Sequence, residues 1–159
     1  MKKMSKRLKI TLIILIVVFI FALFFAIFAL PDIIKTAKRE QEAYKHFEEV
    51  CSFVKENENI FTELSEYQCS LSNDTNEVVA IEREGDMQDK RDVVFKYFDD
   101  GSASIDDDGN VSATYHGHYY SSYEIVLMLS ENIGKEREDY KEGKVINDDM
   151  YLFMLRTRW

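Results

Sequence analysis

The sequence predicts an α+β protein: a single N-terminal transmembrane helix followed by a small domain of helices packed on an antiparallel sheet. Three observations lead to this fold class. An apolar run occupies residues 10–30, an amphipathic segment with helical spacing follows at residues 33–54, and short β-rich runs with Asp-Gly turns occupy residues 77–119. The expected organisation is a basic tail over residues 1–9, a membrane anchor, and one domain over residues 31–159.

The run from Ile10 to Leu30 has the length and composition of a membrane-spanning helix. Seventeen of its 21 residues are Ile, Leu, Val or Phe, three are Ala, and Thr11 is the only polar side chain. At ~1.5 Å per residue the run reaches about 31 Å, close to the ~30 Å thickness of the hydrocarbon core. It is longer than the apolar region of a cleavable signal peptide and lacks the usual small-residue cleavage site. We therefore expect an uncleaved signal anchor, with a cleaved signal peptide as the alternative.

Basic residues on the two sides of this run predict its orientation. Five precede the run and three follow it closely: Lys2, Lys3, Lys6, Arg7 and Lys9, then Lys35, Lys38 and Arg39. Basic residues near a span favour the cytoplasmic side. The sequence therefore predicts a single-pass protein of the cell membrane, held in the lipid bilayer by residues 10–30, with a cytoplasmic N-terminus and the domain outside.

The first part of the domain is predicted to be helical. Apolar residues recur at helical spacing over residues 33–54, so an amphipathic helix is expected to continue from the anchor. The polar stretch 56–59 interrupts this pattern. A shorter helix is expected over residues 60–66, and a loop over residues 70–76.

The middle of the domain is predicted to be an antiparallel meander over residues 77–119. Residues 78–81 and 93–98 are rich in Val, Ile and aromatic residues, as in strands. Asp-Asp-Gly occurs at residues 99–101 and 107–109, and Asp-Gly between such runs is typical of hairpin turns.

The last part is predicted to contain one helix and one strand. Ser121 stands three residues before Glu124, the arrangement of a capping box at a helix start, and the apolar residues 125–129 would form the buried face. Residues 150–155 are apolar and are expected to form a buried final strand.

Cys51 and Cys69 are the only cysteines in the chain. Domains outside the cytoplasm commonly carry disulfides. On one continuous helix the two residues would lie about 27 Å apart, far beyond the ~7 Å limit between bridged Cα atoms. They would come opposite each other if the helix turned back near residues 57–60. We therefore expect a disulfide, with free buried thiols as the alternative.

His116 and His118 lie two residues apart, on one face of a predicted strand, with tyrosines around them. Tyrosine is enriched at binding surfaces, so Tyr115, His116, His118, Tyr119 and Tyr120 are the predicted binding residues. Two imidazoles supply fewer than the three or four protein ligands that a zinc site uses. The sequence therefore predicts no metal site and no cofactor, with His116 and His118 as the alternative candidates for a zinc or copper site.

Residues 106–109, Asp-Asp-Asp-Gly, are similar to part of a calcium-binding loop. In that alignment Tyr115 stands where the loop requires a bidentate glutamate. A tight turn is therefore expected instead of a calcium site.

Residues 31–159 carry 15 basic and 29 acidic side chains, a net charge near −14. Such a surface repels nucleic acid and attracts basic partners. The chain contains none of the common motifs for nucleophilic, zinc-dependent or phosphate-binding chemistry. We therefore expect a membrane-anchored protein of the cell envelope that is not catalytic and that acts in binding or as an accessory or assembly factor. Its expected partner is another protein of the envelope. The short lysine-rich start suggests that the envelope is bacterial.

Two alternatives remain open. The layout, in which an apolar helix continues into an amphipathic helix and then a sheet, resembles that of pilins. The chain departs from the pilin pattern because no glycine precedes the apolar run and no glutamate lies inside it. The other alternative is an anchored hydrolase that uses acidic residues near His116 and His118.

Overall fold

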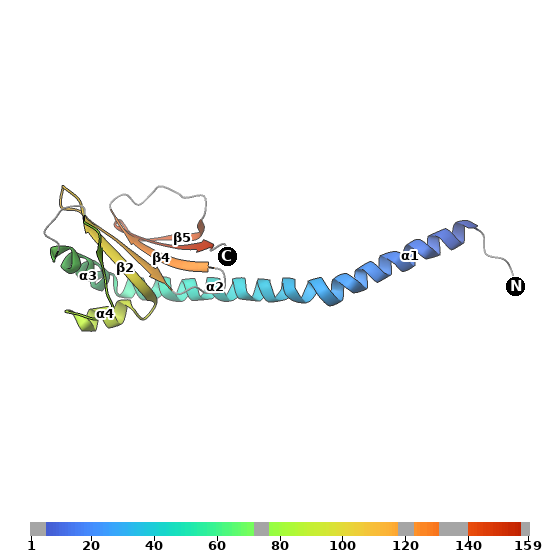
Figure 1. The fold of residues 1–159 in the computed structure, drawn as a ribbon, viewed down its shortest axis with the longest axis horizontal. Helices are drawn as coiled ribbons and strands as arrows, with labels where there is room; N and C mark the ends of the chain where they lie inside the picture. The colour runs from blue at the N-terminus through green and yellow to red at the C-terminus, as the bar shows by residue number, and fades with distance from the viewer. Residues whose placement is uncertain (1–5, 72–76, 118–122, 131–139, 157–159) are drawn as a thin grey trace. The chain divides into compact units, whose positions relative to one another are not determined.

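A computed structural model describes residues 6–71, 77–117, 123–130 and 140–156 (Figure 1). The chain divides into two compact units, Met1–Glu42 and Ala43–Trp159.

The first unit contains α1 (Lys6–Phe24), the π-helical segment η1 (Phe25–Ala29) and the beginning of α2 (Leu30–Glu56). In η1 the amide of Leu30 donates to the carbonyl of Phe25. Pro31 explains this widened turn, because a proline inside a helix lacks an N–H and its ring clashes with the carbonyl four residues earlier. Among the described residues, Lys6–Glu56 is the one helix long and apolar enough to cross a membrane.

The second unit is built on a six-stranded antiparallel sheet. Its strands are β1 (Val79–Ala80), β2 (Phe98–Ile105), β3 (Val111–Gly117), β4 (Tyr123–Leu129), β5 (Tyr140–Asn147) and β6 (Met150–Arg156). Their order in the sheet is β1-β2-β3-β4-β6-β5, so β1 and β5 are the outer strands. The unit also contains α3 (Glu58–Ser70) and α4 (Gln88–Val94).

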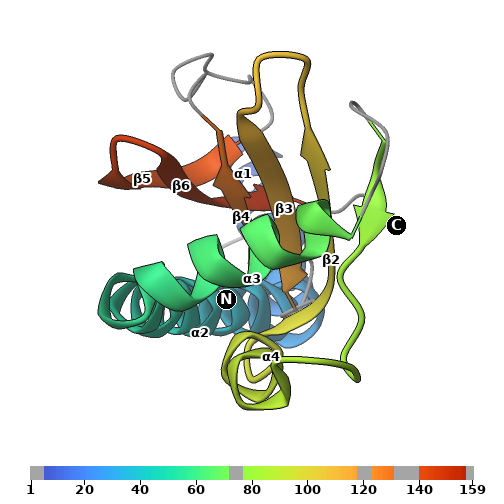
Figure 2. The same cartoon turned by 90° about the vertical axis from the view of Figure 1, so that its left-hand side faces the viewer.

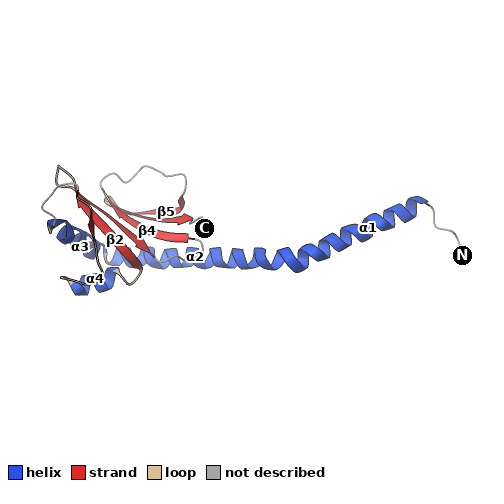
Figure 3. Ribbon diagram, viewed as in Figure 1, coloured by secondary structure: helices blue, strands red, loops and turns tan. Residues whose placement is uncertain are grey.

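The helices of this unit cover one face of the sheet, as Figures 2 and 3 show. The part of α2 from Ala43 onward contributes buried Phe47, Val50 and Val54, at the spacing of one helix face. At the centre lies Phe61 of α3, whose ring meets those of Phe98 and Tyr115 edge-on, at centroid distances of 5.6 and 5.3 Å. Edge-on packing suits aromatic rings, so this cluster joins α3 to β2 and β3.

Two side chains on the second face of the sheet are also buried. Val126 of β4 and Phe153 of β6 are directly paired and each is 2% exposed. Directly paired residues of antiparallel strands share a face, and their neighbours Ile125 and Met154 point to the helices. The inner strands β4 and β6 therefore bury apolar side chains on both faces.

The structure confirms the α+β class and several predicted elements. The helix over residues 33–54, the interruption after it, the second helix, the turn at residues 107–109 and the last strand are all present. The second helix is longer than expected, and the charged segment before the last strand forms β5.

The predicted strand over residues 93–98 is wrong. Helix α4 ends at Val94 and β2 begins at Phe98. Buried Arg91, Val94, Phe95 and Phe98 recur at helical spacing, so tertiary packing favours a helix over the strand propensity of Val and Phe.

The turn predicted at residues 99–101 is also wrong, because these residues lie inside β2. Gly101 pairs with Tyr115 across the sheet, and a Cβ atom at Gly101 would lie 2.8 Å from Cδ1 of that ring. The glycine makes room for Tyr115 and does not serve a turn.

The helix predicted after residue 121 is wrong as well. Residues 123–129 form β4, which lies between β3 and β6. A strand buried on both faces gives a continuous apolar run, which the capping-box pattern misassigned to a helix. Ser121 and Ser122 lie outside the described residues.

Candidate functional site

The predicted disulfide between Cys51 and Cys69 does not form; both are free, buried thiols, 4% and 3% exposed. The helix does break at Asn57, but α3 leaves α2 at a steep angle and does not run back along it (Figure 2). Cys51 and Cys69 lie six residues before and twelve residues after the break, about 9 and 18 Å from it at ~1.5 Å per residue, on helices that diverge from that point. They are therefore beyond the ~7 Å limit between bridged Cα atoms. Burial raises the pKa of the Cys69 thiol, which keeps it protonated and unreactive.

Of the predicted binding residues, Tyr115 belongs to the core and has no exposed surface. Its hydroxyl lies 2.7 Å from Oγ of Ser65 and donates at 3.2 Å to the carbonyl of Phe61. Burial raises the pKa of Tyr115 well above its usual range. This tyrosine therefore joins β3 to α3 and is closed to a partner.

His116 lies on the opposite face of β3, and its side chain is 43% exposed. Its Nδ1 lies 2.6 Å from Oε1 of Glu124 on the neighbouring strand, whose side chain is 12% exposed. The carboxylate orients the imidazole, as an acid–base pair would require. His118, Tyr119 and Tyr120 lie outside the described residues, so their place relative to His116 stays a prediction.

The described residues contain no group of three or more His, Cys, Asp or Glu side chains placed to hold a metal ion. The Asp-rich segment forms a turn, as expected. The Asp106 carboxylate accepts the amide of Asp108 at 3.0 Å and the amide of Asn110 at 2.8 Å. These hydrogen bonds lower the pKa of the Asp106 carboxyl group, and the largest effect comes from the backbone amide of Asn110.

Arg91 of α4 is a buried charge that was not predicted from the sequence. It is 3% exposed, and its Nε donates to the carbonyl of Asp86 at 2.7 Å. The other guanidinium nitrogens donate to the carbonyl of Glu82 and, at 3.1 Å, to Oε1 of Gln68. The backbone of Gly85, at φ +141°, lies against the guanidinium group, and a Cβ atom added to Gly85 would lie 3.4 Å from Cζ of Arg91. Arg91 thus fixes the shape of the loop over residues 82–86.

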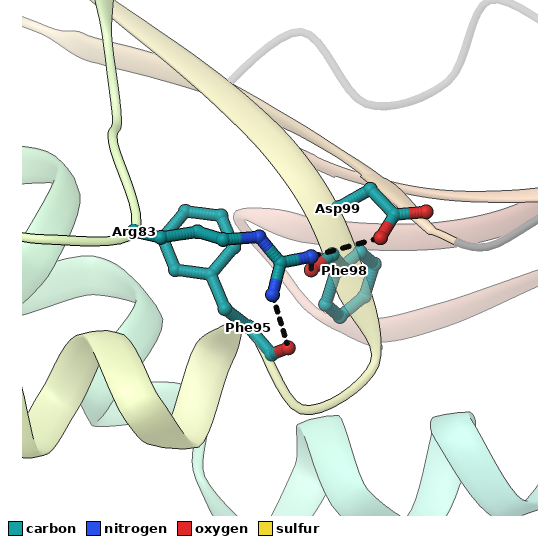
Figure 4. A network of polar contacts seen from close by, with 4 residues as sticks. All are labelled: Arg83, Phe95, Phe98 and Asp99. Atoms are coloured by element: carbon teal, nitrogen blue, oxygen red, sulfur yellow. Dashed lines mark hydrogen bonds and ion pairs between the residues drawn. The ribbon is translucent and has the colours of Figure 1, made fainter.

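A second arginine holds the other end of this loop (Figure 4). Nη2 of Arg83 lies 2.8 Å from Oδ1 of Asp99, and its guanidinium carbon lies 5.3 Å above the centre of the Phe95 ring. Its two terminal nitrogens also donate to the carbonyls of Phe95 and Phe98 at 3.5 and 3.4 Å. The segment between β1 and α4 is therefore tied to β2 through Arg83 and to α4 and α3 through Arg91.

Next to this loop is a cleft of about 570 Å³, which we call the β1 cleft. The end of α3, the strand β1 and the loop over residues 82–86 form its walls. Its lining includes Leu71, Val78, Glu82, Glu84, Asp86 and Arg91. Its volume lies in the ~300–1,000 Å³ range typical of ligand pockets.

A smaller cleft, of about 300 Å³, lies between α3, the turn after β2 and the turn before β6. Two of its polar side chains are already engaged within the protein. The amide nitrogen of Asn147 donates to Glu58 at 2.9 Å, and that of Asn110 donates to Asp106 at 3.0 Å.

The sequence contained one signal for the β1 cleft. Glu82, Glu84 and Asp86 alternate along the chain directly after a short apolar strand. Leu71 and Val78 stay exposed beside these carboxylates because of how the helices and the sheet pack. This packing cannot be predicted from a single sequence.

Comparison with known proteins found no matching family model, no matching curated protein and no matching solved structure.

Proposed function

We propose that this chain is a membrane-anchored protein of the cell envelope whose acidic α+β domain lies outside the cytoplasm and binds another protein there. One observation carries the anchor. Every Ile, Leu, Val and Phe side chain from Leu8 to Ile34 is exposed, between 42% and 71%. Exposed apolar surface on this scale calls for an apolar environment, and a helix in a bilayer satisfies its own backbone hydrogen bonds.

The orientation rests on the basic residues that precede the span. With the N-terminus in the cytoplasm, residues 43–159 lie outside. The binding role is supported by the β1 cleft, whose lining includes two of the three large apolar side chains that are exposed in the described part of the second unit.

A membrane extraction tests the anchor. Ile20, near the middle of the apolar run, is replaced in the full chain by arginine, which costs roughly 2.5–3.5 kcal/mol at the centre of a span. We expect the native chain to stay in the membrane pellet at alkaline pH and Ile20→Arg to be released in part. Val145→Arg, which adds the same charge at an exposed apolar position of the domain, should behave as the native chain. Release of the native chain would overturn the anchor.

Cysteine labelling tests the orientation. Because both native thiols are buried, single cysteines introduced at Lys9 or at Asp108, both exposed positions, can be labelled selectively. An impermeant maleimide added to intact cells should label Asp108→Cys, and should label Lys9→Cys only after permeabilisation. The reverse pattern would place the domain in the cytoplasm.

A further inference from the structure

The β1 cleft lies at an outer edge of the sheet. Among the described residues β1 pairs with β2 alone, through Val79 and Ala80. An outer strand leaves every second backbone N–H and C=O without a partner strand, so an extended peptide can add beside it. Both of these residues also line the β1 cleft.

Exposed apolar side chains gather at this edge. In the described part of the second unit only three large apolar residues are exposed: Leu71 at 57%, Val78 at 69% and Val145 at 61%. Leu71 and Val78 line the β1 cleft, while Val145 lies on β5 at the far edge of the sheet. Covering Leu71 and Val78 would remove apolar surface from water, which favours binding.

The charge of the cleft selects the kind of partner. Glu82 and Glu84 line the cleft and form no ion pair within the described structure. Asp86, the third carboxylate, accepts a hydrogen bond of 2.7 Å from the hydroxyl of Tyr67, which raises the pKa of that hydroxyl. Among the described residues of the lining, Arg91 is the one cation, and it is buried and hydrogen-bonded to the loop and to Gln68. The exposed rim is therefore acidic and suits lysine or arginine side chains.

The cleft is also preformed. Arg91 and Arg83 fix the loop that carries the three carboxylates, so a ligand meets these groups already in place. Preorganisation reduces the ordering cost of binding.

From these observations we propose that the β1 cleft binds an extended, basic segment of a partner protein, which adds to the sheet as a strand beside β1. Its apolar side chains cover Leu71 and Val78, and its lysine or arginine side chains face Glu82, Glu84 and Asp86. The proposal deepens the proposed binding function, on which it rests, by naming the site and the chemistry of the partner.

The test uses the full chain in detergent micelles and a fluorescent peptide of alternating lysine and valine, with binding followed by anisotropy. A second peptide replaces lysine by glutamate, and a third keeps lysine but carries N-methyl groups that block strand pairing. We expect saturable binding of the first peptide only. Equal binding of the N-methylated peptide would overturn strand addition.

Matched variants locate the site. Glu82→Gln/Glu84→Gln should weaken binding about fivefold, within the range measured for exposed charge pairs. Asp108→Asn/Asp148→Asn, with the same loss of charge on exposed turns outside the cleft, should leave the affinity unchanged. Val78→Asp should weaken binding about tenfold, a loss of roughly 1.4 kcal/mol, and Val145→Asp should not. Equal effects of the paired variants would show unspecific attraction to an acidic protein and would overturn the site.

The outcome is separable from that of the proposed function. A chain that stays in the membrane with the domain outside, yet binds the peptide no better than its Val78→Asp variant, retains its anchor and loses only this site.

Discussion

The hydroxyl of Tyr115 on β3 lies 2.7 Å from Oγ of Ser65 on α3, and both side chains are fully buried. Both hydroxyls lie within donating distance of the carbonyl of Phe61, Ser65 Oγ at 2.8 Å and the Tyr115 hydroxyl at 3.2 Å. Each hydroxyl has one hydrogen, so when one of them donates to the carbonyl the other can supply the hydrogen shared by the pair. This buried polar contact joins the sheet to the helix that covers it, within a largely apolar core.

Removing this hydroxyl should destabilise the domain by about 1 kcal/mol, the net value of a typical buried hydrogen bond. Tyr115→Phe keeps the ring and its packing. Urea unfolding of the full chain in micelles, followed by circular dichroism, measures the change. Ser65→Ala should cost a similar amount, and the double variant should cost less than the sum of the two. Additive losses would show that the two hydroxyls act separately.

The same tyrosine predicts a loss of stability at alkaline pH. In the unfolded chain Tyr115 ionises near its usual pKa of ~10, whereas burial raises its pKa in the folded protein. The contribution of protonated Tyr115 to the free energy of unfolding is therefore fully present below pH ~10 and is lost as the pH rises above that value. The free energy of unfolding, measured from pH 8 to 11, should fall less steeply in Tyr115→Phe than in the native chain. Equal slopes would contradict the assignment.

Gly101→Ala should be destabilising, because the new Cβ would lie 2.8 Å from the Tyr115 ring. Overpacking of a core typically costs ~1–3 kcal/mol. Ser102→Ala, one residue along β2 and on the other face, is the matched control and should change stability by less. Thermal unfolding of the two variants compares them directly, and equal shifts would show that the ring moves aside easily.

The buried cysteines predict slow thiol labelling. In the folded chain a maleimide should react slowly with Cys51 and Cys69, and in denaturant it should react quickly with both. Reductant should change neither the labelling nor the free energy of unfolding. Two labels that appear only after reduction would instead reveal a disulfide.

Acid should destabilise the turn between β2 and β3. Hydrogen bonds lower the pKa of folded Asp106 below the value of ~3.9 expected when unfolded. The contribution of the ionised Asp106 carboxylate to the free energy of unfolding is therefore present above pH ~4. It is lost as the pH falls through the lower pKa of this group in the folded protein. Asp106→Asn should unfold with a weaker dependence on pH between 2 and 5. Asp148→Asn, on the turn before β6, serves as control and should follow the native chain.

Much of the helical part could be predicted from the sequence because its signals are local. The helix face of Phe47, Val50 and Val54 and the break before α3 need no distant contacts. The sheet is different. Asp99-Asp100-Gly101 carries the same letters as a true hairpin turn, and only its pairing with Tyr115 shows that Gly101 makes room for a ring.

The candidate site was less predictable than the fold. Tyr115 and His116 are neighbours in the sequence, but alternation along β3 puts one in the core and the other on the opposite face. The disulfide prediction needed the direction in which α3 leaves α2, which depends on how both helices pack on the sheet and cannot be predicted from the break at Asn57 alone. The β1 cleft depends on Arg91, whose burial follows from three carbonyl partners spread over residues 68–86.

The strand order β1-β2-β3-β4-β6-β5 has a consequence for synthesis and truncation. The last strand along the chain, β6, lies between β4 and β5, and β5 pairs with no other described strand. While a ribosome is still making residues 150–156, β4 is paired with β3 on one side only, and β5 has no sheet to join. A chain shortened by this one strand would lose two strands from its sheet, with the apolar flank of β4 left open to association with other molecules.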